Sequence, residues 1–278
     1  MTAAPPPGKR WLADGFESLL KRVAGAGSRT GPDFDVIIVG SGYGGAIAAA
    51  HLATMGKHGK PLSICLLERG EEYVPGMFPG RVAELPPHLR YTSPGQSPAG
   101  NLSGLFDLRL GKDVSSLVAN GLGGGSLINA GVMLPPHASV WKSAWPTAID
   151  GESMASWYDQ AARLLGVESL EVTPTKYHAL ARLDERNTRQ APLTVTVSAT
   201  EERAACNYCG NCTTGCNFGA KTSLDVALLA RARRENRELA CFTGATVVEF
   251  RRQGRGCDPL WRVDVVPTAA ALRKRMPD

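Results

Sequence analysis

Two short apolar runs flank a segment of small residues near the start of the chain. Val36 to Val39 and Ile64 to Leu67 are the apolar runs, and Ala46 to Ala50 is the small-residue segment. Continuous apolar runs of this length are typical of strands buried on both faces of a parallel sheet. We therefore predict a strand, a turn, a helix and a second strand, in the order expected of an α/β fold.

The turn between the first strand and the helix carries the spacing G-x-G-x-x-G, at Gly40, Gly42 and Gly45. In dinucleotide-binding folds the first glycine permits a sharp turn, the second lets the backbone approach a pyrophosphate, and the third lets the helix pack on the sheet. Amide groups at the helix start then bind the phosphates. Glu68 ends the second strand, where an adenosine ribose would offer its hydroxyls. The alternative is an ordinary turn and a solvated strand end, which the ordered succession of elements disfavours.

The first 33 residues have the composition of a tail, rich in Pro, Gly and basic residues. Within them, apolar residues recur at helical spacing between Trp11 and Val23, and this amphipathic stretch is suited to dock on its own domain, on a partner or on an anionic membrane surface. Asp14 and Glu17 dilute its positive face, which favours docking on its own domain.

Residues 71–120 contain six prolines and no clear periodicity, so we predict a long irregular region that covers a ligand or forms a lid. Residues 120–131 follow, with a second glycine cluster whose amide groups could form an anion-binding nest. Ser126 and Asn129 add donors and acceptors suited to a polar ring edge. A flexible glycine turn is the alternative.

The remaining pattern predicts helices over 141–166 and 221–239, with Trp157 and Leu164 among the core residues of the first. Residues 193–197 alternate like a short strand, and two longer strands follow in the last third of the chain. These cover 243–250 and 261–266 and are joined by a glycine-rich turn.

Four of the seven cysteines lie within eleven residues, with the spacing C-x2-C-x2-C-x3-C. This spacing matches bacterial ferredoxins, except that Asn217 replaces the proline that usually follows, so an iron–sulfur cluster is one interpretation. Cys241 or Cys257 could complete such a site. Reduced thiols or a disulfide without metal are equally favoured, and zinc is less so. The candidate ligands are Cys206, Cys209, Cys212 and Cys216.

Composition and charge argue against a nucleic-acid-binding or membrane-spanning protein and say little more about function. The net charge of +5 comes from scattered basic residues with small clusters at 231–237, 251–255 and 273–275, which indicates solvated faces rather than a nucleic-acid footprint. No apolar run is long enough to span a bilayer, and the N-terminus lacks the apolar region of a secretory signal, so we expect a cytoplasmic protein without a transmembrane segment.

Taken together, four motifs resemble those of the flavin-dependent glucose–methanol–choline (GMC) oxidoreductases, in particular the bacterial cholesterol-oxidase-like branch. They are Val39 to Gly45, Leu67 to Gly70, Gly121 to Asn129, and Cys206 to Lys221. The resemblance runs from about residue 35 to 266. It implies an α/β, FAD-binding Rossmann-type fold, a doubly wound parallel sheet with a β-meander.

The resemblance also implies FAD as cofactor and an alcohol as small-molecule substrate, whose hydride passes to the flavin. It places the pyrophosphate at Gly40 to Gly45, the ribose at Glu68, the flavin end at Gly123 to Gly131, and the adenine at the backbone of Val247. The expected cofactor residues are Gly40, Ser41, Gly42, Tyr43, Gly44, Gly45, Glu68, Arg69, Gly123, Gly124, Gly125, Ser126, Asn129, Ala130, Gly131 and Val247.

Family members are about twice as long, and their catalytic histidine lies beyond the point where this resemblance ends. None of the five histidines here falls in a matching stretch, so we assign no catalytic residue. We expect an N-terminal tail (1–33), an FAD-binding domain (34–266) with inserted loops at 71–120 and 206–216, and an unmatched tail (267–278), the fold being incomplete at its C-terminus.

Three hypotheses follow. The first is the FAD-binding portion of an alcohol-oxidising GMC enzyme, acting on a sterol-like or sugar-like substrate. The second is a dehydrogenase subunit whose iron–sulfur cluster passes electrons to an acceptor protein. The third is a non-catalytic remnant. An incomplete sheet would also expose an edge, so a complementing C-terminal polypeptide is an expected partner.

Overall fold

The computed structural model describes residues 11–25, 31–142, 145–146, 148–201, 203–253, 260–269 and 271. Cys257 and most of the last ten residues lie outside this part. The strands are β1 (Ala13–Gly15), β2 (Val36–Val39), β3 (Gly56–Lys57), β4 (Lys60–Pro61), β5 (Ile64–Leu67), β6 (Leu89–Thr92), β7 (Ala99–Gly100), β8 (Phe106–Arg109), β9 (Ser116–Ala119), β10 (Leu239–Thr243), β11 (Ala245–Gln253) and β12 (Leu260–Pro267). The α-helices are α1 (Phe16–Gly25), α2 (Tyr43–Leu52), α3 (Gly151–Leu164), α4 (Thr175–Ala181) and α5 (Ala230–Glu235).

Short helical segments complete the list. One is a π-helix, η6, that runs directly into α5. The others are 3-10 turns. The segments are η1 (Val82–Glu84), η2 (Pro86–His88), η3 (Gly124–Leu127), η4 (Ala138–Lys142), η5 (Cys212–Thr214) and η6 (Asp225–Leu229).

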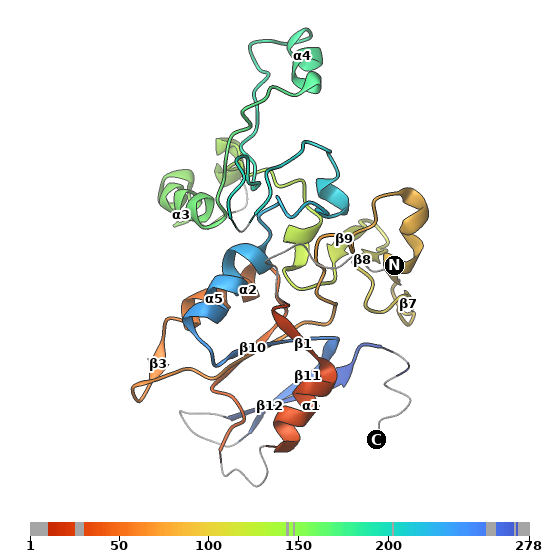
Figure 1. Cartoon of the computed structure of the whole chain (residues 1–278), viewed down its shortest axis with the longest axis vertical. Coiled ribbons are helices and arrows are strands. Elements are labelled where there is room, and N and C mark those ends of the chain that lie inside the picture. Colours follow the sequence, from red (N-terminus) through yellow and green to blue (C-terminus); the bar gives the residue numbers. More distant parts are fainter. Residues whose placement is uncertain are drawn as a thin grey trace.

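A parallel sheet with the strand order β1-β10-β5-β2 forms the centre of the α/β unit (Figure 1). The apolar run of β5 lies between β2 and β10, with Ile64 opposite both Val36 and Leu239. All four residues of β5 are buried. The predicted strand, turn, helix and strand are therefore confirmed, as is the mixed α/β fold with a parallel sheet.

Both faces of this sheet are covered, which explains the continuous apolar runs. Alternate residues of β5 and β10 point to opposite sides, so that Ile64 and Leu66 pack with α2 and η6, whereas Cys65 and Leu67 pack with α1. In Figure 1, α2 and α5 lie on one side of the sheet, and α1 and the β11–β12 pair lie on the other. This is the doubly wound arrangement.

Strand β2 differs from the prediction of a fully buried strand, because it lies at one edge of the described sheet. Val39 is 58% exposed, and Tyr43 and Ile47 on the following helix are also exposed. Sequence pattern cannot reveal this, since an apolar run looks the same whether it has one neighbour or two.

Residues 71–120 also differ from the prediction of an irregular region. They contain a second sheet with the order β7-β6-β8-β9, in which β6 and β8 are parallel. A separate apolar cluster lies beneath it, including Tyr73, Phe78, Leu105 and Leu127. The prolines lie outside strands β6, β8 and β9 and therefore do not interrupt them.

The N-terminal segment docks on its own domain, as its composition favoured. β1 pairs in parallel with β10, and α1 buries Phe16 and Leu19 against the sheet. The segment expected to be a tail thus contributes a strand to the central sheet. At the other end, Thr268 is buried, although residue 267 was the expected start of an unmatched tail.

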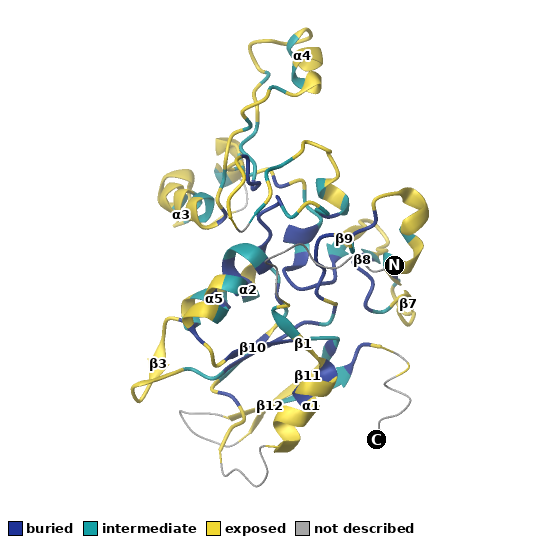
Figure 2. Cartoon of the chain, in the orientation of Figure 1, coloured by how far each residue is buried: buried dark blue, intermediate teal, exposed yellow. Residues whose placement is uncertain are grey.

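The segment that follows the second glycine cluster and contains α3 and α4 is more exposed (Figure 2). Helix α3 begins only at Gly151, and Trp157 is 60% exposed, so its prediction as a core residue was wrong. Residues 193–197 form only isolated bridges rather than a strand. The strands predicted near 243–250 and 261–266 are confirmed as β11 and β12. No helix in the described part of the chain is long and apolar enough to cross a membrane.

Candidate functional site

The turn between β2 and α2 has the backbone geometry that its glycines require. Gly40 has a φ of +87°, and a Cβ on Gly45 would lie 1.9 Å from the carbonyl oxygen of Gly40. Helix α2 begins at Tyr43, and no side chain caps its first turn. The first amide groups of a helix have no intrahelical acceptor, so this end of α2 is suited to bind an anion.

Ser41 joins this turn to two other predicted cofactor segments. Its hydroxyl donates to Glu68 Oε2 at 2.5 Å and accepts from the amide of Gly123 at 3.0 Å. Its own amide also donates to Glu68 Oε2, at 3.1 Å. Ser41 is completely buried. One serine therefore links the first glycine motif, the end of β5 and the second glycine cluster.

The two glycine segments also touch through their backbones. Gly124 has a φ of +54°, and a Cβ there would lie 2.6 Å from the Cα of Gly42. Nearby, the side-chain amide of Asn129 donates to the hydroxyl of Tyr43 at 2.7 Å and accepts from the amide of Gly131 at 3.1 Å. Burial raises the pKa of Tyr43, and the hydrogen bond from Asn129 partly opposes this.

Glu68 is buried, and its oxygens already accept three hydrogen bonds. Besides the two from Ser41, the amide of Gly70 donates to Oε1 at 2.8 Å. An ionised carboxylate has about four acceptor positions, so a ribose hydroxyl would use the remaining one or replace Ser41. The residue therefore holds the site together and is also the acceptor expected for the ribose.

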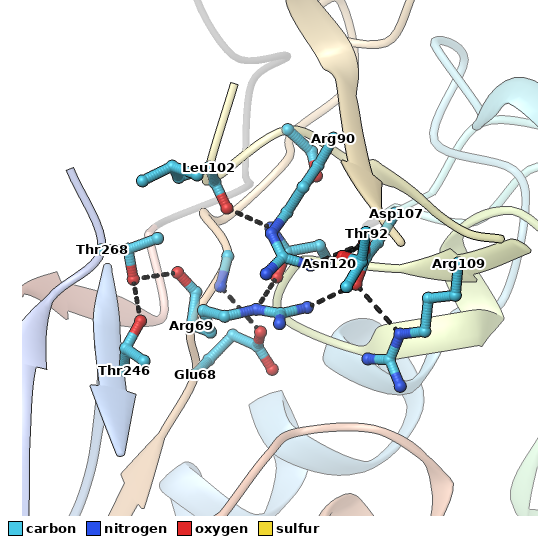
Figure 3. Close-up of polar contacts among 12 residues, drawn as sticks. Glu68, Arg69, Arg90, Thr92, Leu102, Asp107, Arg109, Asn120, Thr246 and Thr268 are labelled. Carbon is cyan, nitrogen blue, oxygen red and sulfur yellow. Dashed lines mark hydrogen bonds and ion pairs between the residues drawn. The ribbon is translucent and has the colours of Figure 1, made fainter. Parts of the chain in front are cut away.

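Arg69, the next predicted residue, belongs to a charged cluster that the sequence did not reveal (Figure 3). Its guanidinium donates to Asn120 Oδ1 at 2.7 Å and to Asp107 Oδ2 at 3.0 Å. The buried Asp107 also contacts Arg90 at 2.6 Å and Arg109 at 3.2 Å. Burial acts to raise the pKa of Asp107, but the hydrogen bonds and charges of these arginines outweigh it and lower the pKa.

The other predicted cofactor residues are placed as follows. Ser126 makes its hydrogen bonds inside the protein, donating to Gly123 O at 2.7 Å and accepting from the amide of Leu224 at 2.9 Å. Ala130 is exposed, and Gly125 is partly exposed. Val247 lies beside a β-bulge in strand β11. The first residue of this strand, Ala245, donates its backbone amide to the carbonyl oxygen of Glu68. Val247 therefore lies near the Glu68 end of the site.

The cysteine loop does not form a metal centre in this structure. Cys206, Cys209, Cys212 and Cys216 all have free thiols, and no three His, Cys, Asp or Glu side chains in the described part of the chain are placed to hold a metal ion. The donor set suits iron or zinc, but its geometry does not. Burial raises the pKa of Cys212, and the charge of Lys221 opposes this effect.

Two polar residues tie the cysteine loop to the rest of the site. The buried ammonium of Lys221 donates to the carbonyl oxygens of Leu127, Asn129 and Cys212. The side chain of Asn217 accepts from the amides of Gly76 at 2.8 Å and Phe78 at 3.1 Å, and donates to Phe78 O at 2.9 Å. Sequence reasoning noted Asn217 only as a departure from the ferredoxin pattern, which was the available signal.

Comparison with known proteins decides the family. The family model described as GMC oxidoreductase matches residues 34–257. The chain belongs to the GMC oxidoreductases. Membership in this family implies FAD as the cofactor, in agreement with the expectation from the motifs. The two glycine segments joined at Ser41 lie inside the matched region.

Two cholesterol oxidases are among the sequence relatives of this chain. The chain is 26% identical to a cholesterol oxidase of Acinetobacter baumannii over 73% of its length, and 29% identical to a cholesterol oxidase of Mycobacterium tuberculosis over 87%. It spans only 39% and 44% of these two relatives. The crystal structure of pyridoxine 4-oxidase from Mesorbium loti aligns with 84% of this chain and 46% of that chain, at 16% identity and a TM-score of 0.40.

Proposed function

We propose that this chain provides the FAD site of an oxidoreductase that acts on the CH–OH group of an alcohol. Bound FAD supplies the hydride acceptor: the alcohol carbon gives up a hydride, the hydroxyl gives its proton to a base, and a carbonyl product results. The observation that supports this most strongly is the convergence of three predicted cofactor segments on Ser41.

The proposed placement of FAD follows the local chemistry. The amide groups at the start of α2, from Gly42 to Gly45, hold the pyrophosphate. Glu68 accepts from the ribose, and the backbone near Val247 contacts the adenine. The segment from Gly123 to Gly131 holds the flavin end, where its positive-φ glycines allow close backbone approach.

The proton acceptor is proposed to lie in elements that pair with the open edge of β2. No histidine of this chain is assigned to that role, and the open edge of β2 carries exposed apolar side chains at Val39, Tyr43 and Ile47. Such an edge favours pairing with a further strand. A polypeptide with the C-terminal elements of a GMC protein would cover this edge and supply that base.

The proposed substrate class and electron acceptor rest on the relatives and on the cysteine spacing, respectively. The cholesterol oxidase relatives favour a sterol-like alcohol, and a sugar-like alcohol is the alternative. A dehydrogenase that passes electrons to an acceptor protein through a cluster at Cys206 to Cys216 rests on the cysteine spacing alone. Measuring iron and acid-labile sulfide in protein prepared without oxygen tests that second function.

The decisive experiment titrates the purified chain with FAD and follows flavin absorbance and fluorescence. We expect binding by the wild type, loss of binding in Gly45→Ala, and retention in Gly31→Ala, because Gly31 lies outside the cofactor segments and a Cβ there meets no atom within 4 Å. A wild-type chain that binds no FAD contradicts the proposal and favours the non-catalytic remnant.

Turnover is tested separately. Cholesterol is added without oxygen to the FAD-loaded chain, with and without the C-terminal portion of the Mycobacterium tuberculosis relative. Bleaching of the flavin only when the second polypeptide is present supports the proposed complementation. Bleaching by the chain alone shows that the base lies in this chain and contradicts the proposed partner.

A further inference from the structure

A cavity of about 1050 Å³ is bounded in part by Leu127, a residue of the second glycine cluster. Ligand pockets of a few hundred to a thousand Å³ hold molecules of drug size. Much of its wall is apolar and aromatic, and the largest of these side chains are Trp11, Tyr73, Phe78, Leu127 and Phe218. Tyr73, Phe78 and Leu127 are buried, so this part of the wall is built from the core of the second sheet.

The same cavity carries an excess of positive charge. Its cationic residues are Arg203, Lys221, Arg233, Arg234 and Arg237, and its acidic residues are Glu201 and Asp225. None of these five cations forms an ion pair with another described residue. Acidic residues near α5 are engaged elsewhere: Glu235 pairs with Arg231 and Glu238 with Arg22.

Two of these cations have hydrogen-bond acceptors for their side chains, and the other three do not. Lys221 and Arg203 donate to neutral oxygens, and Arg203 keeps a buried Nε–H without an acceptor among the described residues. The side chains of Arg233, Arg234 and Arg237 make no hydrogen bond within that part of the chain. Cations stabilise the C-terminal end of a helix, but that role does not require an apolar cavity beside them.

We propose that this cavity binds an amphipathic anion, with a carboxylate or sulfate head and an apolar body. The head lies at the arginines of α5 and its C-terminal flank, where it gains charge-assisted hydrogen bonds. The body lies against Tyr73, Phe78 and Leu127, where burial of apolar surface stabilises it. The proposal goes beyond the FAD-dependent function, because it concerns binding and does not require the flavin.

Isothermal titration of the whole chain with decanoate and with decan-1-ol, with and without FAD, tests the proposal. Decanoate is kept below its micelle concentration and decan-1-ol below its solubility limit in water. The two probes share a chain length and differ in the head group. We expect decanoate to bind about tenfold more tightly, and the preference to shrink as salt rises from about 50 to about 500 mM, because screening weakens exposed charge pairs. Equal affinity for the two probes overturns the proposal.

Matched variants locate the head group. The double variant Arg233→Gln/Arg237→Gln is expected to lower decanoate affinity about tenfold and leave decan-1-ol unchanged. Arg231→Gln is the control, because Arg231 lies on the same helix but pairs with Glu235 and does not line the cavity. Unchanged decanoate affinity in the double variant, or displacement of decanoate by ADP, overturns the proposal. If the chain binds decanoate as expected but does not bind FAD, the proposed function is contradicted and the proposed anion site is not.

Discussion

The hydroxyl of Ser41 lies 2.5 Å from Glu68 Oε2, in a position where Ser41 is fully buried and Glu68 is 7% exposed. The two residues are 27 positions apart in sequence, and their hydrogen bond joins the β2–α2 turn to the end of β5. Because the same hydroxyl accepts from the amide of Gly123, removing it affects three segments together.

Ser41→Ala should therefore destabilise the fold and weaken FAD binding. The change leaves a buried carboxylate with one donor fewer and a buried amide without its acceptor, each of which costs about 1–3 kcal/mol. We expect the unfolding free energy from urea titration to fall by about 2 kcal/mol. Ser116→Ala is the control, since Ser116 is exposed on β9, and its effect should stay within about 0.5 kcal/mol. Equal stabilities of the two variants would contradict the role given to Ser41.

The contact between the two glycine segments gives a second matched pair. Gly124→Ala places a Cβ 2.6 Å from the Cα of Gly42 at a positive φ, whereas Gly125→Ala meets nothing within 4 Å. We expect Gly124→Ala to lower the melting temperature and weaken FAD binding, because backbone must shift at both segments. Gly125→Ala should retain the wild-type melting temperature. Thermal unfolding and FAD titration of the two variants, side by side, check this, and similar losses in both would contradict it.

These glycine positions could be predicted from sequence because their requirement is local. Gly40 and Gly45 serve a single turn, and the turn's partners lie within a few residues. The same is true of β5, whose four apolar residues are buried because sheet neighbours and helices cover both faces. Local pattern was sufficient in these places.

Non-local contacts could not be predicted in this way. Asn217 bonds to Gly76 across 141 residues, and Lys221 to Asn129 across 92. Strand β8 carries a fully buried carboxylate, Asp107, which is satisfied mainly by Arg69, Arg90 and Thr92 on other segments, so its pattern does not indicate a strand. Trp157 has the spacing of a core residue, yet no element of the described chain covers it.

Asp107→Asn tests the cluster of Figure 3. Removing a buried partner leaves three arginines close together, which costs about 3 kcal/mol or more. The pKa of Asp107 is lowered in the folded state, so its stabilisation is present above the ordinary carboxyl pKa of about 4 and is lost as pH falls through the folded value.

We therefore expect a large loss of unfolding free energy at pH 7, and a difference from wild type that shrinks in acid below about pH 4. Asp113→Asn, at an exposed residue in the β8–β9 connection, should change little. A loss that is the same at both pH values would assign the effect to packing rather than to charge.

Asn217→Ala should free the segment that contains Gly76 and Phe78. Its three hydrogen bonds hold this segment to the cysteine loop, and each contributes about 1 kcal/mol. We expect trypsin to cleave at the exposed Arg81 several-fold faster than in wild type, because cleavage requires local opening. Asn211→Ala is the control within the same loop, since the side chain of Asn211 makes no hydrogen bond among the described residues. Unchanged cleavage would show that other contacts hold the segment.

The buried ammonium of Lys221 leads to a prediction about pH. Burial lowers its pKa from 10.5 to about 8, although Cys212, Cys216 and Asp225 act in the opposite direction. Between these two values the unfolded chain binds more protons than the folded chain, so the unfolding free energy rises with pH in this window. The rise is on the order of 3 kcal/mol when complete.

Comparing the unfolding free energies of two proteins, one with Lys221 and one with Lys221→Met, isolates this contribution. Both proteins carry Cys212→Ser, because Lys221 affects the pKa of the Cys212 thiol. The backbone carbonyl of residue 212 is retained. The buried thiols of Cys65 and Cys241, whose pKa values burial raises to about 12, are common to both proteins and largely cancel. Urea titrations from about pH 7.5 to about pH 10.5 should show the protein that keeps Lys221 gaining stability relative to the Lys221→Met variant as pH rises. A constant difference would mean that Lys221 keeps an ordinary pKa, held by its three carbonyl partners despite its burial.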